Sequence, residues 1–293
     1  MVFSKKQKTG FLIALLFAAV VVWVFVFIEE NKTLLEINFF DVGQGDAELI
    51  KTPDKKQILI DGGPDMSVLE KLGSAMPFYD RNIDLIILTH PEKDHLSGLI
   101  EVLKRYKVGA VITSGVFRDS KEYKEWIEIL SAKRIPIFAA RIGGMIDLRN
   151  GAYLKILYPF EDLVGKKFNE SNNTSVVTQL VYGSFETLFT GDIEKSAEEN
   201  LVNSGINLNS DILKIAHHGS KTSSGEKFLK AVNALVAVIE VGKDNQYGHP
   251  HQEVLERLKD VALFATGKDG DIRILSNGLG FEIKNKGSLI SYP

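Results

Sequence analysis

The histidines of this chain are the residues whose spacing first indicates chemistry. All six fall in three close pairs: His90 and His95, His217 and His218, and His249 and His251. Each pair follows an apolar run typical of a buried strand. We therefore expect the pairs on loops at strand ends, where a rigid scaffold presents side chains. For the third pair, the pattern does not separate a functional role from an ordinary loop position.

The first pair encloses two carboxylates. His90, Glu92, Asp94 and His95 offer four possible metal ligands within six residues, and Pro91 favours a tight turn between them. His90 and Glu92 could serve one ion, and Asp94 and His95 a second. Two ions about 3.5–4 Å apart can share a hydroxide and clamp an in-line displacement.

Other apolar runs also end in polar side chains that could complete such a centre. Asp192 follows Leu188-Phe-Thr-Gly and is the candidate carboxylate for bridging two ions. His217 and His218 end a second run, and the spacing leaves open which of them is the ligand. Asp61 ends a third run, where we expect it to orient a ligand histidine unless it only forms an Asp-Gly turn.

Composition limits the kind of metal and of partner. The chain has no cysteine, so any metal must be held by imidazole and carboxylate, which suits zinc, manganese or iron. The formal net charge of −3 gives no support to a large basic surface for nucleic acid.

The N-terminal segment is predicted to be a membrane anchor. Phe11 to Ile28 is an unbroken apolar run that reaches roughly 27 Å as a helix, close to the thickness of the hydrocarbon layer. Lys5, Lys6 and Lys8 precede the run, which places the N-terminus in the cytoplasm and the rest of the chain outside. A cleaved signal peptide is the alternative, but the run is followed by no small-residue cleavage pattern. We expect residues 1–30 to be a cytoplasmic tip and anchor, and residues 31–293 to be one domain.

Strands and helices alternate along the rest of the chain. The first half has strand patterns at 34–40, 47–51, 57–60, 83–89 and 108–113 and helix patterns at 67–75, 95–106 and 120–132. The second half begins with strands at 153–157, 175–182 and 186–190, followed by helices at 195–202, 226–232 and 251–259 with strands between and after them. Two β-rich halves with helices outside indicate an α/β protein with a four-layer αββα sandwich, although the pattern alone fits a general α/β sandwich equally well.

Six ordered motifs carry a family resemblance. They are Phe40-Asp41-Val-Gly43-Gln44-Gly45-Asp46-Ala, Ile60-Asp61-Gly-Gly, Thr89-His-Pro-Glu-Lys-Asp-His95, Leu188-Phe-Thr-Gly-Asp192, Leu213-Lys-Ile-Ala-His-His-Gly-Ser220 and Tyr247-Gly-His-Pro250. The set resembles the metallo-β-lactamase superfamily, and within it most resembles the extracytoplasmic hydrolase domain of the ComEC competence proteins. The resemblance covers roughly Leu34 to Ile283.

The resemblance implies a metal-bound hydroxide that attacks a phosphodiester, with one DNA strand as substrate and a DNA-uptake channel as partner. It implies zinc or manganese, one or two ions, held by His90, Glu92, Asp94, His95, Asp192 and one of His217 and His218. It implies catalytic roles for Asp94, Asp192, His218 and His249, and roles around the metal or substrate for Asp41, Asp46, Asp61, Asn173 and Ser220.

Two departures from the superfamily pattern affect the first ion. Glu92 stands where the superfamily has a second histidine, and Asn172-Asn173-Thr174-Ser175 occupies the stretch of a third. The first position is therefore poor in imidazole, and we expect it to bind weakly, to prefer manganese or to be empty. The position formed by Asp94, His95, Asp192 and one histidine is complete.

Three other functions compete with a nuclease. Hydrolysis of another phosphate ester, such as choline phosphate on a cell-wall polymer, suits the mildly acidic composition. A β-lactamase is disfavoured because the three-histidine site is incomplete. A membrane-tethered binding subunit with a vestigial site is disfavoured because every ligand of the second position is retained.

Overall fold

The computed structural model describes residues 5–30 and 34–293, which form two compact units divided at Leu34. The first unit contains one long helix, α1 (Lys5–Glu30). Within it, Lys6–Val24 is long and apolar enough to cross a membrane, with a mean hydropathy of 1.9. An N-terminal signal sequence meets the same criterion, so this property alone does not define an anchor.

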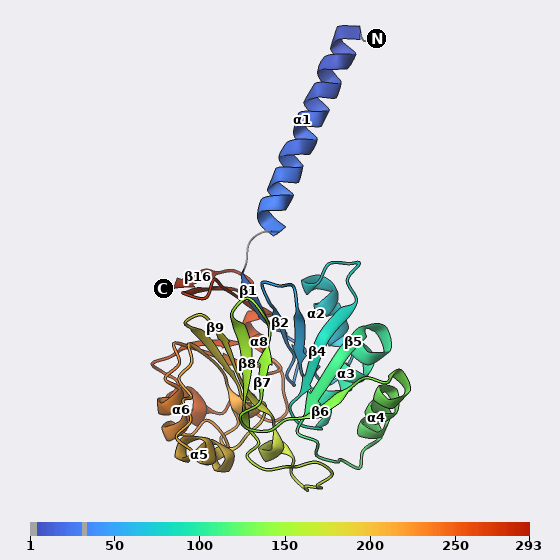
Figure 1. Ribbon diagram of the computed structural model, residues 1–293. Helices are drawn as coiled ribbons and strands as arrows, with labels where there is room; N and C mark the ends of the chain where they lie inside the picture. Colours follow the sequence, from blue (N-terminus) through green and yellow to red (C-terminus); the bar gives the residue numbers. More distant parts are fainter. Residues whose placement is uncertain (1–4, 31–33) are drawn as a thin grey trace. The chain divides into compact units, whose positions relative to one another are not determined.

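The second unit, Leu35–Pro293, contains two sheets that face each other (Figure 1). The first has the order β16-β15-β14-β1-β2-β3-β4-β5-β6, and the second has the order β13-β12-β11-β10-β9-β8-β7. The strands of the first sheet are β1 (Leu35–Phe39), β2 (Glu48–Lys51), β3 (Gln57–Ile60), β4 (Asn82–Leu88), β5 (Lys107–Thr113), β6 (Ile137–Ala139), β14 (Ile272–Ser276), β15 (Phe281–Lys284) and β16 (Leu289–Tyr292). Those of the second are β7 (Met145–Asp147), β8 (Ala152–Tyr158), β9 (Val177–Tyr182), β10 (Phe185–Phe189), β11 (Ile212–Lys214), β12 (Val236–Ile239) and β13 (Ala262–Ala265).

One strand from each sheet, β3 and β12, shows how both faces of a strand are buried, because successive side chains point to opposite sides. In β3, Ile58 and Ile60 belong to the core between the sheets, whereas Leu59 belongs to the core on the outer face. In β12, Val238 packs between the sheets and Ile239 packs outward. Strands buried on both faces have continuous apolar sequences, which explains the unbroken runs of this chain.

Helices cover the two outer faces and complete an αββα sandwich. The first sheet is covered by α2 (Ser67–Ala75), α3 (Lys93–Arg105) and α4 (Lys121–Lys133), and the second by α5 (Lys195–Asn203), α6 (Glu226–Val232) and α7 (Gln252–Arg257). Figure 1 shows α3 and α4 on one outer side and α5 and α6 on the other. A short helix, α8 (Thr266–Asp269), follows β13. The predicted four-layer architecture is confirmed.

The ends of the parallel strands place the polar residues. β3 and β4 are parallel neighbours in one sheet, and β10, β11 and β12 are parallel neighbours in the other. Asp61 follows β3, His90 follows β4, Asp192 follows β10, His218 follows β11 and Glu240 follows β12. Because parallel strands end at the same edge of a sheet, these side chains gather at one end of the sandwich.

Candidate metal centre

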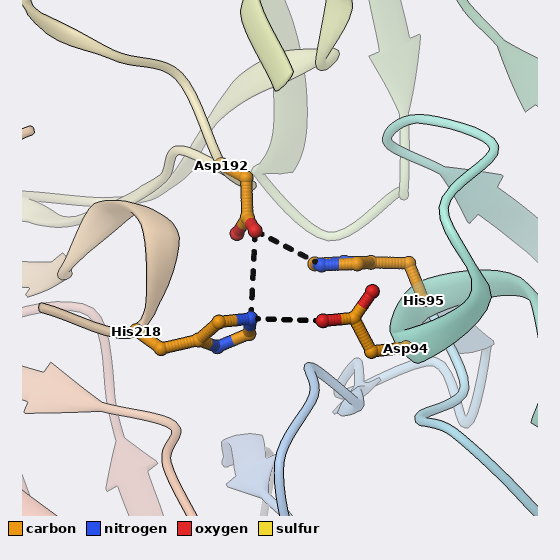
Figure 2. A group of neighbouring side chains, drawn as sticks. All are labelled: Asp94, His95, Asp192 and His218. Carbon is orange, nitrogen blue, oxygen red and sulfur yellow. Dashed lines mark ion pairs between the residues drawn. The ribbon is translucent and has the colours of Figure 1, made fainter. Parts of the chain in front are cut away.

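Four side chains from three segments converge on one point (Figure 2). His95 Nε2 lies 3.3 Å from Asp192 Oδ2, and His218 Nε2 lies 3.4 Å from the same oxygen. Asp94 Oδ2 is 3.3 Å from His218 Nε2. The four ligand atoms all lie within 4.8 Å of one another, and neither imidazole Nε2 has a hydrogen-bond partner among the described residues. Two nitrogens and two carboxylate oxygens directed at one point fit a divalent cation such as zinc or manganese.

The N-terminus of α3 positions two of these ligands. The helix begins at Lys93, so Asp94 and His95 lie in its first turn. The loop before β2 approaches this turn closely, since a Cβ on Gly45 would lie 2.3 Å from the backbone oxygen of Asp94. The backbone N–H of Asp46 donates to the same oxygen over 3.3 Å. Only a glycine at position 45 permits this packing of the loop against the ligand turn.

An unusual backbone separates the two adjacent histidines. His217 and His218 both have left-handed conformations, with φ of 52° and 53°. Such conformations cost of order 1–3 kcal/mol per residue and persist where the surroundings impose them. They direct His218 into the group of four, while His217 contacts Thr222 Oγ1 over 3.3 Å and Asn172 Nδ2 over 3.4 Å. The structure therefore favours His218 as the ligand and leaves His217 beside the centre.

Buried oxygens orient both ligand imidazoles from behind. Asp61 Oδ2 lies 2.7 Å from His95 Nδ1, and the backbone oxygen of Glu240 lies 2.9 Å from His218 Nδ1. Asp46 Oδ1 is 3.2 Å from the same His218 nitrogen. With Nδ1 protonated, each ring presents the lone pair of Nε2 to the centre.

The charges at the centre also suit a cation. Burial disfavours a charged imidazolium at His95, yet the carboxylates of Asp192, Asp61 and Asp46 outweigh it and raise the pKa well above its usual value. Burial likewise opposes charge on His218, but Asp192 and Asp46 raise its pKa to about 10. The pKa of the Asp192 carboxyl is held well below its usual value against burial, by His218 and His95. The cluster thus attracts positive charge strongly.

A buried charged network that the sequence did not indicate lies behind Asp192. Lys214 is fully buried, forms an ion pair with Asp46 and donates to the backbone oxygen of Gly191 over 3.0 Å. Its Nζ is 3.7 Å from Asp192 Oδ1. Burial and the Asp46 carboxylate raise the pKa of buried Glu240 to about 8. The sequence signal for this network is a charged residue at the end of an apolar strand, as Lys214 is in β11 and Glu240 is after β12.

The residues predicted for the first metal position make other contacts. His90 is fully buried and its ring is tilted by 53° against that of His95, with centroids 4.2 Å apart, and its Nε2 has no hydrogen-bond partner among the described residues. The Glu92 carboxylate forms an ion pair with Arg118 and accepts a hydrogen bond from Ser171 Oγ. Neither His90 nor Glu92 belongs to the group of four, and no sequence motif indicates Arg118 or Ser171 at this place.

Only some of the residues assigned by resemblance line the cavity beside the centre. Asn173 donates to Glu194 Oε2 over 3.1 Å, so its neighbour Asn172 lines the cavity beside the centre instead. Ser220 is buried and its Oγ lies 3.1 Å from Thr222 Oγ1. Asp41 does not line this cavity. Of the third histidine pair, His249 lines the cavity, whereas His251 precedes α7 and accepts a hydrogen bond from the backbone N–H of Lys221.

The centre opens into a polar cavity of about 290 Å³. Its lining includes Asp94, Arg118, Asp192, His217, His218 and His249. Burial and the neighbouring histidines lower the pKa of His249 to about 4, so this imidazole is neutral at neutral pH. An adjoining groove of about 620 Å³ shares Gln44, Glu92, Asp94 and Tyr247 with the cavity.

Comparison with known families agrees with this geometry. The model of the metallo-β-lactamase superfamily matches residues 40–242. The chain belongs to the metallo-β-lactamase superfamily. The match spans every ligand of the centre and confirms the family predicted from the six motifs. Because members of this superfamily bind divalent metals, the converging His and Asp side chains have a direct explanation.

Among curated proteins, the chain is similar to competence proteins. It is 30% identical over 282 residues to ComE operon protein 3 of Bacillus subtilis, which covers 88% of this chain and 34% of that protein. It is 29% identical over 260 residues to competence protein ComA of Neisseria gonorrhoeae, which covers 86% of this chain and 33% of the relative. The chain thus spans about a third of the length of these relatives, and the similarity to competence proteins is confirmed.

Solved structures support the fold. Igni18, a metallo hydrolase from Ignicoccus hospitalis, is 15% identical with a TM-score of 0.51, and the alignment covers 82% of this chain and 98% of that one. At this level of identity the likeness concerns the two-sheet architecture alone.

Proposed function

We propose that this protein is a metal-dependent phosphodiesterase, with a nucleic-acid strand as its substrate. The observation that carries the proposal is the convergence of His95 Nε2, His218 Nε2, Asp94 Oδ2 and Asp192 Oδ2 beside an open polar cavity. A divalent cation bound there would supply Lewis acidity and lower the pKa of a water molecule.

The side chains of this protein would bind the ion, orient its ligands and contact the substrate. Asp94, His95, Asp192 and His218 would hold the ion, while Asp61 and the Glu240 backbone oxygen keep the two imidazoles in the correct tautomer. His217 and His249 face the cavity and do not belong to the group of four. Neutral His249 presents an uncharged imidazole to the substrate, and His217 can contact a phosphate oxygen or the leaving group.

The competence relatives support DNA as the substrate and a DNA-uptake channel as the partner. The acidic lining of the cavity, with Glu92, Asp94, Glu170 and Asp192, favours a small phosphate ester as the second candidate. A polyanionic strand would meet repulsion there unless bound metal and Arg118 offset it.

A substrate panel separates these functions. The full chain, purified in detergent and reconstituted with Mn²⁺ or Zn²⁺, is offered single- and double-stranded DNA, RNA, bis-(p-nitrophenyl) phosphate and p-nitrophenyl phosphorylcholine. We expect metal-dependent cleavage of single-stranded DNA and the small diester, and loss of both activities with EDTA. Cleavage of the phosphorylcholine ester alone would support the second candidate. Stoichiometric metal binding without hydrolysis of any substrate would support a binding subunit.

We further propose that residues 1–30 remain attached as a single membrane span and that residues 31–293 form the extracytoplasmic domain. The apolar segment Lys6–Val24 supports a span, and the lysines before the apolar core support this orientation. Protease added to spheroplasts should digest the domain while a cytoplasmic control protein stays intact. Digestion only after lysis would contradict the orientation.

A further inference from the structure

The carboxylate that a second metal ion would need is paired with an arginine. A two-ion centre would hold this second ion at the first predicted position, with His90, Glu92 and Asp192, and Asp192 would also hold the ion of the group of four. Glu92 instead directs its carboxylate to the Arg118 guanidinium and to the Ser171 hydroxyl. Arg118 Nη1 also donates to Ser171 Oγ over 3.1 Å. The three side chains therefore contact one another in every pairwise combination.

The chain holds Arg118 in place from both sides. The preceding residue, Phe117, pairs its backbone with the segment at Lys166 and Lys167, and the N–H of Phe117 donates to the Lys166 oxygen over 2.9 Å. Lys167 Nζ lies 4.7 Å from the centre of the Phe117 ring. Ser171 is 1% exposed, so its hydroxyl is a fixed partner. These contacts fix the backbone before Arg118 and one partner of its guanidinium, so the fold determines where the guanidinium lies.

The positive charge of Arg118 distinguishes it from the rest of the cavity lining. Apart from histidines, Arg118 is the one basic side chain among the described residues that line the cavity, whose acidic lining includes Glu92, Asp94, Glu170 and Asp192. A guanidinium carries five N–H donors in a planar fork that suits phosphate oxygens. The two contacts through Nη1 account for two of these donors, which leaves donors for an anion in the cavity.

We propose that Arg118 replaces the second metal ion: its fixed positive charge holds Glu92 away from the centre, so that the protein binds one divalent ion and uses the guanidinium as the second cation facing the substrate phosphate. The inference rests on the proposed function, since it concerns the number of ions in the same centre. Nη1 neutralises Glu92, and the remaining donors take the place of a second Lewis acid at a phosphate oxygen.

Removing the guanidinium should restore the second ion. In Arg118→Ala, Glu92 loses its counter-charge, while His90 Nε2 and Asp192 Oδ1 have no hydrogen-bond partner among the described residues and could join Glu92 in holding an ion. Full-length protein is titrated with Mn²⁺ alone by calorimetry and by electron paramagnetic resonance. We expect one ion in the wild type and two in Arg118→Ala, where ions about 3.5–4 Å apart would give an exchange-coupled spectrum.

Three variants serve as controls. Arg118→Lys keeps the positive charge and should bind one ion. The double variant Glu92→Gln with Arg118→Ala removes the carboxylate that the second ion would use, and should also bind one. Arg141→Ala removes an exposed arginine of the same type, paired with Asp162 outside this cavity, and should match the wild type. Melting temperatures of all variants are measured without metal, so that a purely structural role appears as lower stability with an unchanged ion count.

Each outcome has one meaning. Two ions in the wild type would overturn the inference and leave the proposed function intact. One ion in Arg118→Ala would overturn it as well, because the guanidinium would then not be what excludes the second ion. No ion in the wild type would contradict the proposed function itself, and the inference would fall with it.

Discussion

Replacement of Asp61 by asparagine tests the centre through a residue that does not touch the ion. Asp61 accepts three hydrogen bonds, from the Thr89 backbone N–H over 2.8 Å, from Thr89 Oγ1 over 2.6 Å and at His95 Nδ1 over 2.7 Å. Asparagine has nearly the same shape but only one acceptor oxygen. If that oxygen keeps the Thr89 backbone bond, the side-chain NH₂ faces His95 Nδ1 and donates to it.

A donor at this position reverses the tautomer of His95. With Nδ1 as acceptor, the proton moves to Nε2, and the lone pair that would bind the ion is lost. Residues that orient a metal-binding histidine typically contribute about 10- to 100-fold in metal affinity. Reversal of a tautomer has cost about 10⁴-fold in turnover in the Ser-His-Asp triad. We therefore expect Mn²⁺ affinity to fall by about 100-fold, which equals about 2.7 kcal/mol.

The assay compares Asp61→Asn with Asp84→Asn. Asp84 lies near the beginning of β4, accepts hydrogen bonds from Lys56 Nζ and the Gln57 backbone N–H, and does not line the cavity. Mn²⁺ affinity is measured by calorimetry, and the protonation of His95 by nitrogen-detected NMR of the labelled protein. Asp61→Asn should lose affinity and show a protonated Nε2 in the metal-free state at high pH, whereas Asp84→Asn should change neither.

Wild-type affinity in a folded Asp61→Asn protein would refute the reasoning, because His95 would then not depend on Asp61 for its tautomer. Loss of affinity with an unchanged NMR signature would also refute it, since the effect would come from a general disturbance of the fold.

Four further predictions concern the ligands directly. Asp192→Ala should retain the fold in circular dichroism and reduce turnover by a factor of about 10²–10⁴, because it removes a ligand and a carboxylate beside both imidazoles. His218→Ala should abolish stoichiometric Mn²⁺ binding, whereas His217→Ala should keep one ion, as metal analysis of the purified variants would show. Apparent Mn²⁺ affinity should rise by about 10- to 100-fold per pH unit between pH 6 and 8, because the pKa of His218 is raised to about 10 and protons must leave before the ion binds. In the metal-free protein, the same raised pKa stabilises the fold fully below about pH 6.5, and this contribution is lost as the pH rises toward 10, which melting curves with and without Mn²⁺ would reveal.

The layers of the fold could be predicted because their signals are local. Unbroken apolar runs mark strands buried on both faces, and the predicted strand at 57–60 and the helices at 67–75 and 226–232 have the observed bounds. The edge strands β6, β7 and β16 were not predicted. Each has only three or four residues and is largely exposed, so it shows no alternation that a sequence pattern could detect.

The ligand set could be predicted where the chain itself fixes the geometry. Asp94 and His95 are adjacent in one helical turn, so their sequence spacing determines their separation. The choice between His217 and His218 depends on two left-handed residues, which no pattern of residue types specifies. Glu92 was predicted as a ligand from its place between two histidines. Its carboxylate instead turns to Arg118, which lies 26 positions away and carries no motif.

The buried network predicts that such a centre folds without a metal. Asp46, Asp94 and Asp192 have depressed pKa values, and Lys214 and the two raised-pKa imidazoles supply the opposite charge around them. A divalent ion that displaces one proton from His95 and one from His218 brings two positive charges and removes two. The net charge of the buried centre is then the same with and without the ion. The energetic cost of burying uncompensated carboxylates is therefore avoided in both states, and metal binding becomes an exchange with protons rather than a condition for folding.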